Sequence, residues 1–119
     1  MFSIMQTKEV PELDSWGTAA DLGSEILEGG CRASGKMVFG APDAPVSCAY
    51  FAVTTGSFRM IYPFTEHAVV VEGSVTLTDD RTGTSVTYNA GDAWLIEKGT
   101  PVTWKVEGER FVKNYMAIA

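Results

Sequence analysis

The sequence predicts a small all-β protein in which antiparallel strands close into a barrel, preceded by an N-terminal arm. From Ser47 onward, short apolar or alternating runs are separated by turn residues at intervals close to the ~8 to 12 residues typical of sandwiches and barrels. Little of the chain has helical periodicity. A run of about eight antiparallel strands must bury one face and protect its edges, and closure into a barrel does both.

The first 45 residues differ from the rest because they are rich in turn residues, such as Glu28-Gly29-Gly30 and Pro42-Asp43-Ala44-Pro45. We expect residues 1–45 to form an arm of the same domain, with one or two short strands and a helical turn near Thr18 to Leu22. This arm could pack on its own barrel or on a second subunit. Residues 46–119 are then the barrel.

Each predicted barrel strand ends at recognisable turn residues. Thr55-Gly56, Pro63 and Gly73 end the early strands, and Asp79 to Gly83 forms a hairpin turn whose Gly83 can take a positive φ. Alternation over 74–78 is typical of a half-buried strand. The expected strands are 48–54, 58–62, 68–71, 74–78, 85–88, 93–97, 102–106 and 110–118.

Composition limits the partners. A chain of 119 residues is long enough for one ordinary core, and its net charge of -6 argues against nucleic acid and anionic membranes. Cys31 and Cys48 lack a further Cys or His at ligand spacing, so we expect small apolar residues that are buried or half-buried. The start of the chain lacks a signal-like pattern, and no run approaches a membrane span. We expect a cytoplasmic protein.

Two motifs of this chain resemble those of the cupin superfamily, which implies a jelly-roll (RmlC-like) β-barrel. The first cupin motif runs His-x-His-x3-Glu-x6-Gly, and Glu66 and Gly73 fit its last two positions. The second runs Gly-x5-Pro-x-Gly-x2-His, and Gly91 and Gly99 fit its glycines. Further details, including Lys98-Gly99-Thr100 and Trp104, are similar to the small single-domain group of the (S)-ureidoglycine aminohydrolase cupin domain and the ethanolamine-utilisation cupins. The likeness covers residues 45 to 117.

The metal ligands that the resemblance implies are largely missing. Met60, Tyr62 and Val102 stand where the motif has histidines, and Glu66 alone keeps a donor. One carboxylate cannot offset the dehydration of a divalent cation, so we expect no metal and no cofactor. His67 is the only histidine, and strand alternation places it on the face opposite Glu66.

The same alternation predicts a pocket with mostly apolar walls inside the barrel. Glu66 and Tyr62 are the candidate catalytic residues. Desolvation could keep Glu66 neutral as a general acid or base, or Lys113 or Arg59 could hold it ionised as an anchor for an ammonium or amide group. Val102 and Val106 would face the motif residues. The candidate ligand-binding residues are Met60, Phe64, Trp104, Lys113 and Tyr115.

Two functions follow from this pocket. The first is a metal-independent cupin that binds a small polar metabolite, such as a nitrogenous one, with catalysis left open. The alternative is a non-catalytic sensor or assembly module whose barrel is packed solid by its large side chains. The resemblance also predicts a homodimer, because an isologous contact would cover exposed strand edges.

Overall fold

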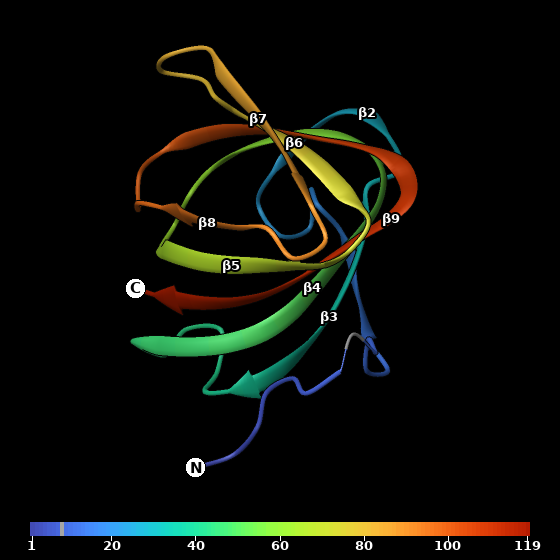
Figure 1. Ribbon diagram of the computed structural model, residues 1–119. Coiled ribbons are helices and arrows are strands. Elements are labelled where there is room, and N and C mark those ends of the chain that lie inside the picture. The colour runs from blue at the N-terminus through green and yellow to red at the C-terminus, as the bar shows by residue number, and fades with distance from the viewer. Residues whose placement is uncertain (8) are drawn as a thin grey trace.

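The computed structural model describes residues 1–7 and 9–119, and nine antiparallel strands form its regular structure (Figure 1). The described residues contain no helix of the length and apolar character needed to cross a bilayer. The strands are β1 (Asp14–Thr18), β2 (Glu25–Gly29), β3 (Arg32–Phe39), β4 (Val46–Ile61), β5 (Thr65–Glu72), β6 (Ser74–Asp79), β7 (Thr84–Asn89), β8 (Ala93–Ile96) and β9 (Pro101–Ile118).

Two long strands, β4 and β9, belong to both layers of the barrel and join them. The first half of β4 pairs with the second half of β9, and this layer has the order β1-β3-β4-β9-β5-β8. The second half of β4 pairs with the first half of β9, and β2, β6 and β7 extend this layer. The apolar faces of the two layers therefore meet inside a single closed core, as in a jelly roll.

Sequence reasoning divided each of these long strands into two, and the structure corrects this. The register between β4 and β9 shifts between Thr54 and Gly56, so the chain bends there without leaving the sheet. Gly56 has a φ of 148°, and the Thr55 hydroxyl donates a hydrogen bond to the Gly108 carbonyl across the bend. The two glycines mark corners rather than strand ends.

The N-terminal segment packs on its own barrel. β3 pairs with β4, β1 pairs with β3, and β2 pairs with the second half of β4. It holds three strands where one or two were expected. The predicted helical turn is a pair of overlapping turns, in which the Leu22 and Gly23 amides donate to the Ala19 and Ala20 carbonyls.

The core between the layers contains a cluster of aromatic rings. Trp104 packs edge-on against Trp94 and Phe111, with ring centroids 5.8 and 5.6 Å apart, and Tyr88 packs against Trp94 at 5.0 Å. Val102, Trp104 and Val106 are buried, as their predicted parity requires. Cys31 and Cys48 are buried free thiols.

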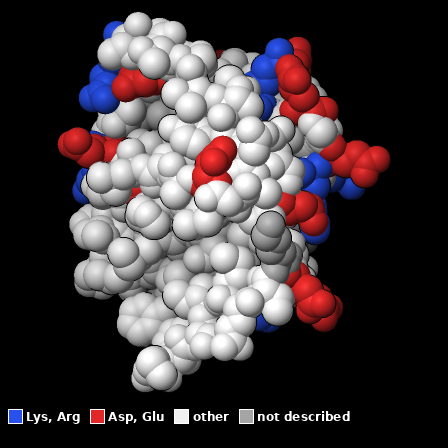
Figure 2. All heavy atoms as spheres, in the orientation of Figure 1, with Lys and Arg blue, Asp and Glu red and all other residues white. Residues whose placement is uncertain are grey.

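The outer face of the first layer carries a mostly apolar row across five strands. Leu95, His67, Met116, Cys48 and Phe39 occupy successive cross-strand positions on β8, β5, β9, β4 and β3. Figure 2 shows a broad area without charged side chains at the lower left, where the start of β4 and the C-terminus lie in Figure 1. His67 is exposed on this face, as alternation predicts. The homodimer stays a prediction.

Candidate functional site

Glu66 is completely buried inside the barrel, and both of its carboxylate oxygens have partners. It lies on β5, where alternation turns it toward the core together with Ala68. Oε1 accepts a hydrogen bond from the Lys113 ammonium, and Oε2 accepts one from the Trp94 indole N–H at 3.0 Å. The partners come from β9 and β8, the two strands that flank β5. Arg59, the other cation considered for this role, pairs with Asp80 at 2.9 Å instead.

Lys113 is only 5% exposed and its ammonium lies among aromatic rings. Its Nζ is 4.5 Å from the ring centroid of Tyr115, 4.9 Å from Trp104 and 5.2 Å from Phe51. Such ring faces attract a cation. Burial lowers the pKa of Lys113 below its ordinary value, and the Glu66 carboxylate opposes part of that change.

Tyr62 is 1% exposed, and its hydroxyl has no hydrogen-bond partner among the described residues. The indole N–H of Trp104 is likewise buried without a partner. Burial raises the pKa of Tyr62 well above its usual value, and the nearby Glu66 carboxylate adds to the rise. A tyrosine held neutral in this way is a poor general base at neutral pH.

Replacing Tyr62 with Phe is expected to change the free energy of unfolding at pH 7 by no more than about 1 kcal/mol, because the buried hydroxyl makes no bond to lose. A tyrosine whose pKa is higher in the folded than in the unfolded protein adds to stability at pH values below the pKa of the unfolded chain. That contribution is lost as the pH rises above the unfolded-state pKa. Tyr62→Phe should therefore lose less stability than the wild type between about pH 9 and pH 11. Urea unfolding of both proteins at about pH 9 and pH 11 checks this. An equal loss of unfolding free energy in the wild type and in Tyr62→Phe would contradict it.

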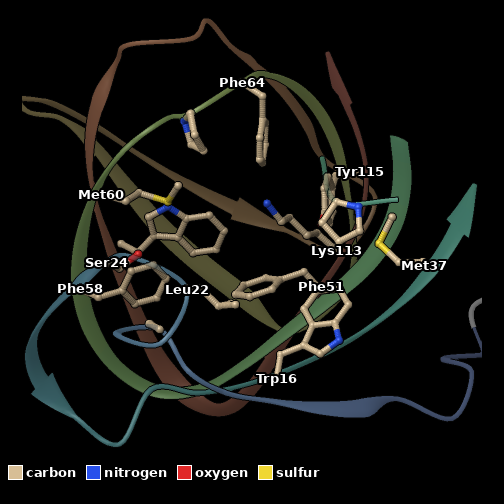
Figure 3. Close-up of a pocket in the computed structure, with 14 residues that line it drawn as sticks. Trp16, Leu22, Ser24, Met37, Phe51, Phe58, Met60, Phe64, Lys113 and Tyr115 are labelled. Atoms are coloured by element: carbon tan, nitrogen blue, oxygen red, sulfur yellow. The ribbon is translucent and has the colours of Figure 1, made fainter. Parts of the chain in front are cut away.

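A cavity of about 440 Å³ opens beside Lys113 at one end of the barrel (Figure 3). We call it the barrel cavity. In Figure 3 the Lys113 amine points into the space between Phe51, Phe64 and Met60. The large side chains therefore fill one end of the barrel and leave the other open. The lining residues are Trp16, Ala19, Leu22, Ser24, Met37, Pro42, Phe51, Phe58, Met60, Pro63, Phe64, Trp104, Lys113 and Tyr115.

The structure separates the predicted site residues into two sets. The five candidate ligand-binding residues all line the barrel cavity: Met60, Phe64, Trp104, Lys113 and Tyr115. The two candidate catalytic residues, Glu66 and Tyr62, are buried and do not line it. The charged group that faces the cavity is thus the Lys113 ammonium, with the Glu66 carboxylate bound to it.

Sequence reasoning missed much of the cavity wall. Phe51 and Phe58 on β4 are the cross-strand partners of Lys113 and Trp104, so pairing β4 with β9 would have identified them. Trp16 from β1 has no such local signal. It lies over Gly35, where an added Cβ would come within 2.3 Å of the indole ring. A glycine at this position makes room for the aromatic wall.

The residues in the motif positions do not fit a divalent metal. Among the described residues no three His, Cys, Asp or Glu side chains gather at one point. Glu66 is already neutralised by Lys113, and Met60 lines the cavity with a thioether. An ion here would have one carboxylate and would have to lie against an ammonium, which is unfavourable on both counts.

Comparison with known proteins identifies a matching family model and similar solved structures. The model described as EutQ-like cupin domain matches residues 40–115. None of the curated proteins compared with the chain matches it. The EutQ protein of Clostridium difficile is similar over 74% of this chain and 68% of its own, with 19% identity and a TM-score of 0.63.

Two further structures support the fold. A cupin 2 conserved barrel domain protein from Salinispora arenicola covers 73% of this chain and 76% of its own, with 18% identity and a TM-score of 0.59. A Pseudomonas syringae protein of unknown function covers 91% of this chain at 18% identity with a TM-score of 0.77, and the match spans 45% of that protein. These likenesses establish a jelly-roll barrel.

Proposed function

Because this chain belongs to the EutQ-like cupin domain family, we propose that it binds a small organic molecule in the barrel cavity without a metal. The observation that carries the proposal is the cavity itself, with apolar and aromatic walls and one charged side chain, Lys113. Apolar walls that supply affinity and a few polar groups that orient the ligand are the usual makeup of a small-molecule site.

The polar end of the ligand should be a hydrogen-bond acceptor. An ammonium carries three N–H groups, and Glu66 takes one of them. The others can donate to a carbonyl or carboxylate oxygen. This changes one expectation from the sequence: a ligand amine would meet the Lys113 cation before it could reach Glu66, whereas an amide could bind through its oxygen. We therefore propose a mainly apolar metabolite with a carbonyl-type end.

Thermal shift with three probes of similar size tests this: benzamide, benzoate and benzylamine. Benzamide and benzoate are expected to raise the melting temperature, while benzylamine should not, because its ammonium would lie beside that of Lys113. A ligand present at about 100 times its Kd adds about 2.7 kcal/mol to the free energy of unfolding.

Two substitutions on neighbouring residues of β4 locate the binding. Met60→Trp would fill the barrel cavity, because Met60 lines it. Ile61→Trp is the matched control, since Ile61 is 70% exposed on the opposite face of the same strand. The response should disappear in Met60→Trp and persist in Ile61→Trp. No response of the wild type to any probe, or equal responses of both variants, would contradict the proposal.

A further inference from the structure

Lys113 is the only charged residue among the described residues that line the barrel cavity, and it is an amine in an apolar setting. Its Nζ contacts the Glu66 carboxylate and points into the cavity in Figure 3. The other lysines that the structure describes, Lys36, Lys98 and Lys105, are exposed. Lys113 is therefore the described lysine whose chemistry the fold changes most.

We propose that Lys113 Nζ is a nucleophile that captures an aldehyde or ketone in the barrel cavity as a Schiff base. The inference rests on the proposed function, since the carbonyl compound must first bind in the cavity. A lysine becomes nucleophilic in a hydrophobic pocket because desolvation favours its neutral amine. The lowered pKa of Lys113 has this cause.

Glu66 is placed to move the protons of this reaction. Its Oε1 can take a proton from the Lys113 ammonium, which leaves a neutral amine with a free electron pair. Nζ attacks the carbonyl carbon, and the carbonyl oxygen receives the proton from Glu66 and a second proton from Nζ. The C–O bond then breaks, water leaves, and a protonated imine remains beside the Glu66 carboxylate. One ammonium and one carbonyl give one iminium and one water, so atoms and charge balance.

The aromatic rings around Nζ suit the product as well as the reactant. The iminium keeps the positive charge at nitrogen, so it keeps the attraction of the Tyr115, Trp104 and Phe51 ring faces. The apolar walls limit the access of water, which hydrolyses imines. The pair of Lys113 and Glu66 would thus carry the cation of a covalent intermediate in the barrel where the cupin motif places its metal ligands.

Reductive trapping with benzaldehyde and sodium cyanoborohydride tests the inference on the intact chain. Peptide mass spectrometry measures N-benzylation at each lysine at about pH 7.5. We expect Lys113 to be modified at least about tenfold faster than Lys36 and Lys98, because binding in the barrel cavity holds the aldehyde beside its Nζ. Lys113→Arg should abolish the adduct at this site, Met60→Trp should suppress it, and Ile61→Trp should leave it unchanged.

Thermal shifts with benzyl alcohol, which has no carbonyl, separate the two hypotheses. If benzyl alcohol raised the melting temperature but Lys113 formed no preferential adduct, the Schiff-base proposal would be overturned and the proposed binding site would stand. A preferential adduct that survives in Met60→Trp would also overturn it, because the cavity would then play no part. If the melting temperature did not change and no adduct formed, both the proposed binding site and the proposed nucleophile would be contradicted.

Discussion

Replacing Lys113 with Met is expected to lower the free energy of unfolding by about 3–5 kcal/mol. The substitution leaves Glu66, which is 0% exposed, with the Trp94 N–H as its remaining partner. A buried carboxylate without its counter-ion keeps its desolvation cost and loses the attraction that offset it. Urea unfolding at pH 7 measures the change.

A double-mutant cycle with Glu66→Gln separates the ion pair from packing. Glutamine keeps an oxygen that can accept the Trp94 hydrogen bond, so this substitution removes mainly the charge. The Lys113→Met/Glu66→Gln protein should be less destabilised than the sum of its single changes by about 2–3 kcal/mol. Additive losses would mean that the two side chains do not depend on each other.

Lys105→Met is the matched control for Lys113→Met. Lys105 pairs with Glu107 at 3.6 Å, and their side chains are 55% and 79% exposed. An exposed pair of this kind contributes at most about 1 kcal/mol. If Lys105→Met lowered the free energy of unfolding as much as Lys113→Met, burial would not be the reason that the Lys113–Glu66 pair contributes to stability.

Gly73→Ala is expected to cost about 2–5 kcal/mol, whereas Gly83→Ala should cost only about 1 kcal/mol. Both glycines lie in turns with nearly the same φ, +74° and +75°. They differ in their surroundings: an added Cβ at Gly73 would lie 2.3 Å from the Arg110 carbonyl oxygen, while at Gly83 nothing lies within 4 Å. Backbone strain is therefore common to both, and the crowding is specific to Gly73.

The difference between the two alanine variants measures how tightly the turn after β5 packs against the bend of β9. Thermal and urea unfolding of both proteins would give it directly. Equal losses would mean that the Arg110 backbone can move away at little cost, and that Gly73 is present for its dihedral angles alone.

The fold could be predicted largely from local signals. Alternation over residues 74–78 and the turn from Asp79 to Gly83 gave the β6–β7 hairpin, and parity turned Glu66 inward and His67 outward. The lengths of β4 and β9 could not be predicted in this way. A glycine ends a strand or bends it, and only the partner strand decides which. Here β4 and β9 pair with each other on both sides of the bend, so both strands stay continuous.

Strand alternation alone predicts which side chains of the candidate site point into the barrel, but not which strands lie next to each other. Met60, Trp104 and Lys113 follow from alternation along two strands, and Lys113 was one of two cations considered as partners of Glu66. The choice against Arg59 depends on which strands are neighbours, since Arg59 faces Asp80. Trp16 joins the wall only because β1 pairs with β3, a contact between segments without a pairing signal in the sequence.

The shared strands also determine when the protein can fold during synthesis. The β4–β9 ladder joins residues 40 to 72 positions apart, from Ile61 with Pro101 to Val46 with Ile118. A ribosome must therefore release the chain through Val106 before the layer of β2, β6 and β7 can close, and through Ile118 before the other layer can close. Residues 46–54 wait unpaired on the β9 side until then. Contacts this distant slow folding, so β4 is the segment of the nascent chain most in need of protection from other chains.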